Sequence, residues 1–297
     1  AGPVSVSVPS MLLAWLTGNS LIRRKDALTA ENALMLARWA WSFLPMSNKF
    51  YRDWSSGRLQ SFTVRFRETD LWIGVDSYRP EMKEAVYKEV ISCHTELNRC
   101  ITKYPAFLTS LEPLAFHWQS EIVKRMMEAT RLAGVGPMAA VAGAIADRVG
   151  HFLMETYDVR EVAVENGGDI FVKNDDPLVI SVYAGASKLS GRVGLEMPPG
   201  EWGVCTSSGT VGNSLSFGWA DAVTVVSPDA TLADALATAY GNLVKEAEDI
   251  EKVLALALNE KVETLLIIVG DQLGIIGRHS LKFQERARGC QPLDLKT

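Results

Sequence analysis

Two hydrophobic patterns alternate along this chain, one typical of helices and one typical of strands. In the stretch 80–101, Val86, Val90 and Leu97 recur at helical spacing, and a proline stands at its start. In 60–66 and 70–76, apolar and polar residues alternate as they do in half-buried strands joined by a hairpin. The sequence therefore predicts a mixed α+β protein.

The same reasoning predicts further elements. Helices are expected at 119–132, 137–154 and 246–258, and one more begins near Thr231, which can cap it. Strands are expected at 161–165, 170–173, 179–183, 192–196, 222–226, 264–269 and 274–277. Two adjacent glycines, Gly167 and Gly168, lie between two of these strand segments. They indicate either a bulge or a place where a ligand lies against the backbone.

A polar loop is expected at 206–214, before the buried strand 222–226. Five of its nine residues carry hydroxyl groups and two are glycines. Glycines let backbone N–H groups approach an anion, and hydroxyls add donors, so the loop suits a phosphate or pyrophosphate. A plain hairpin or interface loop has the same composition. The residues that would donate are Thr206, Ser207, Ser208, Gly209 and Thr210.

The helix after Thr231 carries two oxygen-bearing side chains on one face. Asp234 and Thr238 are four residues apart, and their neighbours are nearly all Ala or Leu. A carboxylate and a hydroxyl on a small apolar face suit a hard cation such as Mg²⁺, with phosphates completing its shell. Alternatively, Asp234 favours the helix N-terminus electrostatically and Thr238 bonds back to a carbonyl.

Composition limits the classes of partner. The 297 residues carry a net charge of −5, with 47% hydrophobic and 22% charged residues, as in ordinary globular proteins. No basic run with interleaved aromatics and no long apolar run occurs, so we expect neither a nucleic-acid partner nor a membrane span. The four cysteines lack CxxC spacing, which argues against a metal cage. Reduced cysteines and no evident secretion signal predict a cytoplasmic protein.

Residues 1–50 form a separate block by composition, and 51–297 form the main domain. The stretch 29–43 predicts an amphipathic helix, so the block is expected to be a helical extension. Its Trp39 and Trp41 either contact a protein partner or pack on the main domain. The sequence leaves the role of the block open, and also whether the protein forms a homo-oligomer.

Several motifs together resemble a known family. The segments 166–170 (NGGDI), 206–209 (TSSG) and 233–239 (ADALATA) occur in the order and approximate spacing of the ApbE-like flavin transferases, which move FMN from FAD onto a protein Ser or Thr. The segment 143–146 (GAIA) resembles that family's helix start. The stretch 51–245, which includes 107–113 (FLTSLEP) and 134–143 (GVGPMAAVAG), is still more similar to a small uncharacterised family of ApbE relatives.

The resemblance implies a fold and a set of site residues. The fold would consist of two related α/β halves, each with an antiparallel sheet backed by helices. Mg²⁺ would lie on Asp234, Thr238 and a main-chain carbonyl near Ala142 or Gly143. The remaining cofactor-binding residues beside FAD or FMN would be Gly143, Gly167, Gly168 and Asp169.

One departure from the family pattern affects the chemistry. The transferases carry a His-x-Ile-Asp-Pro segment where this chain reads 212–218 (GNSLSFG), and none of the four histidines lies there. Ser214 or Ser216 would have to substitute as the catalytic group. The sequence thus supports two hypotheses: a Mg²⁺-dependent FMN transferase or FAD pyrophosphate hydrolase, and a non-catalytic nucleotide-binding module within a redox assembly. A purely structural domain is a third, which predicts no nucleotide binding.

Overall fold

The computed structural model describes residues 58–210, 218–257 and 261–283, all of which belong to one compact unit. The expected helical extension at 1–50, with Trp39 and Trp41, lies outside these residues. Ser214 and Ser216, the expected catalytic groups, also lie outside them.

An eight-stranded antiparallel sheet forms the centre of the fold, in the order β1-β2-β3-β4-β7-β8-β9-β10. A second sheet has three strands in the order β11-β6-β5. The strands are β1 (Gln60–Phe66), β2 (Thr69–Val75), β3 (Val162–Asn166), β4 (Asp169–Asn174), β5 (Leu178–Ser181), β6 (Val193–Met197), β7 (Gly200–Ser207), β8 (Ala222–Ser227), β9 (Thr264–Val269), β10 (Gln272–Gly277) and β11 (Ser280–Phe283).

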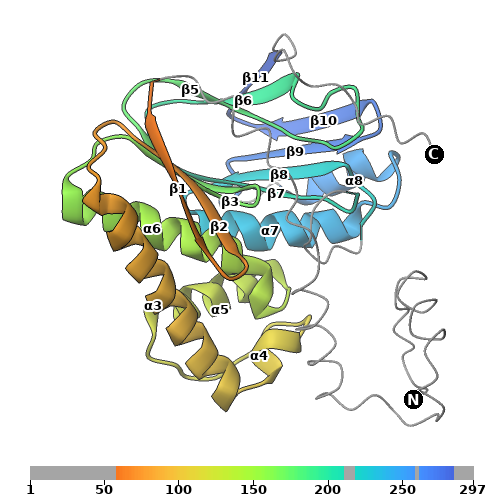
Figure 1. The fold of residues 1–297 in the computed structure, drawn as a ribbon. Helices are drawn as coiled ribbons and strands as arrows, with labels where there is room; N and C mark the ends of the chain where they lie inside the picture. The colour runs from red at the N-terminus through yellow and green to blue at the C-terminus, as the bar shows by residue number, and fades with distance from the viewer. Residues whose placement is uncertain (1–57, 211–217, 258–260, 284–297) are drawn as a thin grey trace, which may run out of the picture. The chain divides into compact units, whose positions relative to one another are not determined.

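Helices cover one face of the large sheet, and the small sheet lies on the other face (Figure 1). The helical elements are α3 (Glu81–Lys103), α4 (Ala106–Thr109), α5 (Glu121–Ala133), the 3-10 turn η2 (Pro137–Ala140), α6 (Val141–Tyr157), α7 (Ala230–Leu243) and α8 (Asp249–Leu256). Successive strand residues point to opposite faces, so Cys205 joins the helix-side core and Val204 the core under the small sheet. The mixed α+β class predicted from the sequence is confirmed.

The resemblance predicts two halves with a separate sheet each, but in the described residues the central strands form one sheet. β4 pairs along its whole length with β7, from Asp169 opposite Cys205 to Asn174 opposite Gly200. This ladder joins the strands of the two expected halves into one continuous sheet. The helices therefore share one face of that sheet.

Two local predictions also need correction. Gly167 and Gly168 form the two-residue turn of a hairpin between β3 and β4, not a bulge in one strand. Gly167 and Gly168 have φ angles of +73° and +113°, which L-residues rarely adopt, and this explains the glycine pair. Thr206 and Ser207, expected in a loop, are the last two residues of β7.

Within the part of the chain that the structure describes, no single helix is long and apolar enough to cross a membrane. The pair Glu121–Ala133 and Pro137–Tyr157 passes the same test only when combined, and the chain bends by 105° between them.

Glycine at position 203 allows α7 to pack directly on β7. A Cβ atom there would lie 2.2 Å from the carbonyl carbon of Asp229 and 2.3 Å from the nitrogen of Ala230. Both are backbone atoms at the start of α7, so neither can move without moving the helix.

We therefore expect Gly203→Ala to lower the free energy of unfolding by about 3 kcal/mol. The matched control is Gly270→Ala. That glycine has a φ of +59° and no atom within 4 Å of a built Cβ, so only backbone strain of about 1 kcal/mol is expected. Urea denaturation measures both. Equal losses would contradict the close packing at Gly203.

His279 connects β9, β11 and the small sheet's core. Its Nδ1 lies 2.8 Å from Thr264 Oγ1, its backbone N–H donates to the same oxygen, and its ring meets Trp202 edge to face. Burial, together with the charge of Arg278, lowers the pKa of His279 to about 4. The folded protein thus holds this imidazole neutral.

The lowered pKa of His279 predicts a pH dependence of stability. As the pH falls from about 6.5 towards 4, the unfolded chain binds the proton and the folded chain does not, so folding is disfavoured. We expect the wild type to lose about 1–3 kcal/mol more than His279→Gln across this window. Denaturation at several pH values tests this, with His117→Gln at an exposed histidine as control. Parallel pH profiles for wild type and His279→Gln would contradict it.

Candidate functional site

Helices α6 and α7 cross at very short range. A Cβ atom on Gly143 would lie 2.1 Å from the carbonyl oxygen of Ala230 and 2.9 Å from Cβ of Asp234. Only glycine allows this approach. The crossing brings the N-terminal turns of both helices into the protein interior, where their free N–H groups need acceptors.

Asp147 of α6 supplies acceptors to the start of α7. Its carboxylate accepts hydrogen bonds from the N–H groups of Ala230 and Thr231, each 2.8 Å long, and from the Thr231 hydroxyl. The side chain is 1% exposed and lies 3.2 Å from the guanidinium of Arg125. Burial and the nearby Asp229 raise the pKa of Asp147, while Arg125 opposes the shift.

Asp234 of α7 does the same for the start of α6. Its Oδ2 accepts the N–H of Gly143 at 2.9 Å, and the carboxylate also accepts the N–H of Ala142. Each helix thus caps the other with a carboxylate from its interior. The N-cap of α7 itself is Asp229, which accepts from Leu232 N–H, so the expected cap at Thr231 is wrong.

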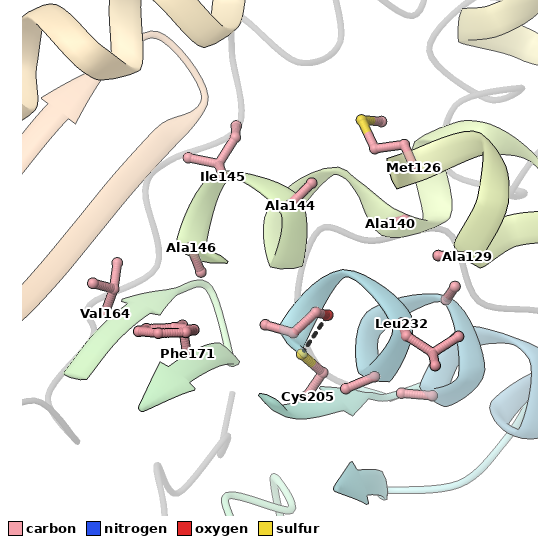
Figure 2. Close-up of a cluster of buried hydrophobic side chains, with 14 of the residues drawn as sticks. Met126, Ala129, Ala140, Ala144, Ile145, Ala146, Val164, Phe171, Cys205 and Leu232 are labelled. Atoms are coloured by element: carbon pink, nitrogen blue, oxygen red, sulfur yellow. Dashed lines mark hydrogen bonds between the residues drawn. The ribbon is translucent and has the colours of Figure 1, made fainter. Parts of the chain in front are cut away.

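The sheet contributes further groups below this crossing. Cys205 of β7 donates through its Sγ to the Ala230 carbonyl at 3.3 Å, and Figure 2 shows this bond between the strand and α7. Asp169 of β4 is directly opposite Cys205 in the ladder and is 8% exposed. Burial, together with the charges of Asp169, Asp234 and Asp147, raises the pKa of the Cys205 thiol. The thiol is therefore protonated.

Asp169 and Asp234 form a pair of neighbouring carboxylates. Burial and the negative charge of Asp169 raise the pKa of Asp234 well above its usual range, and the bonds from Gly143 and Ala142 only partly oppose this. A cation beside these oxygens would offset both the burial of Asp234 and its repulsion by Asp169. In the described ranges no group of three or more His, Cys, Asp or Glu side chains is arranged for a metal, so other oxygens would have to complete the shell.

The main-chain carbonyl of Ala142, expected as a metal ligand, does not face the Asp234 carboxylate. Its carbonyl oxygen accepts from Asn166 Nδ2 at 3.1 Å. The carbonyl of Ala142 and the N–H of Gly143 belong to one trans peptide unit, so they point in opposite directions. Because the N–H points at Asp234, the Ala142 carbonyl points away from it.

Thr238 lies one helical turn beyond Asp234 on the same face of α7, and it is partly buried. This agrees with the expected pairing of a carboxylate and a hydroxyl. The side chain of Thr206, in contrast, lies on the opposite sheet face from Cys205, and its hydroxyl pairs with Thr224 Oγ1 at 2.9 Å. Thr206 is therefore apart from Asp234.

The N–H groups expected to bind phosphate already have acceptors. Gly143 N–H donates to Asp234, Gly168 N–H to Glu165 Oε1 at 2.9 Å, and Gly209 N–H to the Ala220 carbonyl at 2.9 Å. Thr210 N–H donates to the hydroxyl of Ser208. These bonds close turns and caps, so these four groups do not form an open anion-binding nest.

The start of the polar loop is tied to the strand that returns from it. Thr210 Oγ1 donates to Asp221 Oδ1 at 2.9 Å, and Ser208 Oγ donates to the Ala220 carbonyl at 3.5 Å. On β7, Ser207 is 8% exposed and shares the helix-side face with Cys205. Of the expected loop donors, Ser207 is thus the one whose side chain faces α7 from the sheet.

Asp147 and the Asn166 amide are not among the site residues that the sequence predicts. A signal for Asp147 was present, because it is the one acidic residue in the Ala- and Gly-rich run 139–147 and lies one turn after Gly143. Asn166 was part of a motif, but nothing in the motif indicates that its amide reaches α6.

Comparison with solved structures defines the class of fold. The flavin transferase ApbE from Vibrio cholerae superimposes with a TM-score of 0.50 at 14% sequence identity, over 73% of this chain and 96% of that one. The ApbE protein from Thermotoga maritima gives 0.50 at 16% identity, over 72% and 96%. The described domain therefore has an ApbE-like fold.

Sequence comparison then identifies the family. The family model described as AbpE bacteria matches residues 52–276. The UPF0280 protein of Methanococcus vannielii is 38% identical over 228 residues, which cover 74% of this chain and 91% of that protein. The UPF0280 protein of Methanocaldococcus jannaschii is 39% identical over 72% of this chain and 89% of its own length. The chain belongs to the UPF0280 family, as the resemblance noted in the sequence predicted.

Asp147 of α6 and Asp229 both accept hydrogen bonds from the start of α7, but the reciprocal caps predict that losing Asp147 costs more stability. Asp147→Ala leaves buried N–H groups and Arg125 without their acceptor, so we expect a loss of about 3–5 kcal/mol in the free energy of unfolding. Asp229→Ala removes an ordinary N-cap, for which about 1 kcal/mol is expected. Chemical denaturation of both variants decides, and a loss at Asp147 no larger than at Asp229 would contradict the reciprocal arrangement.

Proposed function

We propose that this protein binds a flavin nucleotide, FAD or FMN, through a divalent cation such as Mg²⁺ held by Asp234 and Asp169. The observation that carries the proposal is the pair of neighbouring carboxylates in a partly buried position, where the charge of Asp169 adds to burial in disfavouring the charged form of Asp234. A divalent cation with hard oxygen ligands suits such a pair. Thr238 supplies a hydroxyl on the same helix face, and the nucleotide's phosphates complete the shell.

Charge and hydrogen bonding both support a cation-dependent mode of binding. A pyrophosphate that approached Asp169 and Asp234 alone would be repelled. The nearby guanidinium of Arg125 lies within 4 Å of Asp147 and Asp229, and so compensates those carboxylates instead. Because the N–H groups of Gly143 and Gly168 are engaged, the cation would supply the positive charge that these groups do not offer to the phosphates. When bound, it would neutralise the pyrophosphate and polarise its phosphorus–oxygen bonds.

Flavin is the proposed nucleotide because of the fold. Vibrio cholerae ApbE, which shares it, is named a flavin transferase. The identity of 14% carries the fold and not the chemistry, so flavin recognition by this chain is a proposal of ours.

A second candidate function is catalytic: transfer of FMN from FAD to a protein hydroxyl, or hydrolysis of the FAD pyrophosphate. In either reaction an oxygen nucleophile attacks the phosphorus of the FMN portion and AMP leaves. The ApbE-like fold favours this candidate. The absence of a histidine from 206–234 favours binding alone, since the most common general base is then missing from that segment.

Calorimetric titration of FAD with and without Mg²⁺ tests the binding proposal. We expect binding only with Mg²⁺, and Asp234→Ala should weaken it at least roughly tenfold because a charged ligand is lost. Asp229→Ala, at the N-cap of the same helix, is the matched control and should bind as the wild type does. Equal FAD affinity in the presence of EDTA would contradict the proposal.

Release of AMP separates the two candidates once binding is established. FAD with Mg²⁺ should yield AMP if the protein is a transferase or hydrolase, and Asp234→Ala should abolish the yield. Tight binding without AMP release identifies a binding module.

A further inference from the structure

We infer that Asn166 is a positioning residue that orients Asp234 through a single peptide unit of α6. The inference rests on the cation site proposed above. Asn166 Nδ2 donates to the Ala142 carbonyl at 3.1 Å, and the Gly143 N–H of the same peptide unit donates to Asp234 Oδ2 at 2.9 Å. The peptide unit between residues 142 and 143 is thus held at both ends.

The geometry of a trans peptide explains why both ends matter. The unit is planar, and its carbonyl and N–H point in opposite directions. The unit lies in the first turn of α6, which sets its overall direction, and a donor on the carbonyl restrains it further. The donor also polarises the unit and strengthens the outgoing hydrogen bond. Removal of the Asn166 amide would leave this peptide unit held by the helix alone, so the donor to Asp234 would be less polarised and less tightly positioned.

The position of Asn166 connects the two carboxylates of the proposed site. It is the last residue of β3, is 7% exposed, and pairs with Asp169 across the Gly167-Gly168 turn. The hairpin that carries Asp169 is thereby joined to the peptide unit that orients Asp234. Groups that orient a metal-binding carboxylate in this way typically contribute 10–100-fold to metal affinity.

A purely structural role for Asn166 makes a different prediction, and the chain contains a suitable control. Asn174, at the other end of β4, is 1% exposed, and its Nδ2 donates to the carbonyls of Asp176, Met197 and Pro198. It is also a buried asparagine that bonds to the backbone, but it has no connection to Asp234. Loss of either amide should destabilise the fold, whereas only loss of the Asn166 amide should weaken the binding of a cation.

The experiment is a titration with Mn²⁺ alone, followed by the electron paramagnetic resonance signal of the free ion. We expect Asn166→Ala to bind Mn²⁺ about 10–100-fold more weakly than the wild type. Asn174→Ala should keep the wild-type affinity although its melting temperature falls. Asn166→Leu preserves the volume and lacks the amide, so it replaces the alanine variant if that variant does not fold. Loss of Mn²⁺ binding in Asp234→Ala would assign the bound ion to the proposed cation site.

The outcomes separate this inference from the function on which it rests. Loss of Mn²⁺ binding in Asp234→Ala with wild-type affinity in Asn166→Ala would overturn the role of Asn166 and retain the cation site. Equal weakening in Asn166→Ala and Asn174→Ala would also overturn it, because stability alone would then explain the effect. No binding by the wild type, or unchanged binding in Asp234→Ala, would overturn the site and the inference together.

A second measurement observes the peptide unit itself. Labelling with carbonyl-¹³C alanine and ¹⁵N glycine selects the Ala–Gly peptide units, which are Ala1–Gly2, Ala133–Gly134, Ala142–Gly143 and Ala184–Gly185. We expect the same cross-peak to be displaced by Asn166→Ala and by addition of Mg²⁺ to the wild type. Displacement of different cross-peaks by these two changes would contradict the connection through residues 142 and 143.

Discussion

The arrangement of this domain depends on how the buried N-termini of two crossing helices obtain hydrogen-bond acceptors. Burial of a free N–H group without an acceptor is costly, and α6 and α7 each bury such groups where they cross. Asp147 caps α7 and Asp234 caps α6, so neither helix start is satisfied without the other helix. The close crossing in turn requires glycine at position 143. Packing and hydrogen bonding therefore specify one relative position for the two helices on the sheet.

The same caps determine the electrostatics of the candidate site. They bring Asp147 and Asp234 near one buried thiol, Cys205, and the pairing of β4 with β7 places Asp169 opposite that thiol. Asp147 has Arg125 as a counter-charge, whereas the pKa of Asp234 is raised by burial and by Asp169. A region with this distribution of charge favours a cation over a bare anion. Among the described residues that suggested a phosphate cradle, Gly143 serves close packing, Gly168 a hairpin turn, and Gly209 and Thr210 the closure of a loop.

Elements with strong local periodicity could be predicted from the sequence, and those without it could not. The expected helix 80–101 differs from α3 by no more than two residues at either end, and the first hairpin was also found. β7 was missed because its residues mix Gly, Glu, Trp and Thr, and its strand conformation follows from ladders with β4 and β8. Likewise, adjacent glycines are compatible with a bulge or a hairpin, and only the pairing of β3 with β4 distinguishes them.

The sequence by itself determined the α+β class, most of the elements, the family, and the placement of Asp234 and Thr238 on one face of a small-residue helix. The tertiary structure decided that the strands form one sheet, that Asp147 and Asp234 cap each other's helices, and that the Ala142 carbonyl points away from Asp234. The reason is the distance along the chain between partners. The Gly143–Asp234 bond joins residues 91 positions apart and the Ala230–Asp147 bond residues 83 apart, and residue type does not encode the direction of a peptide unit.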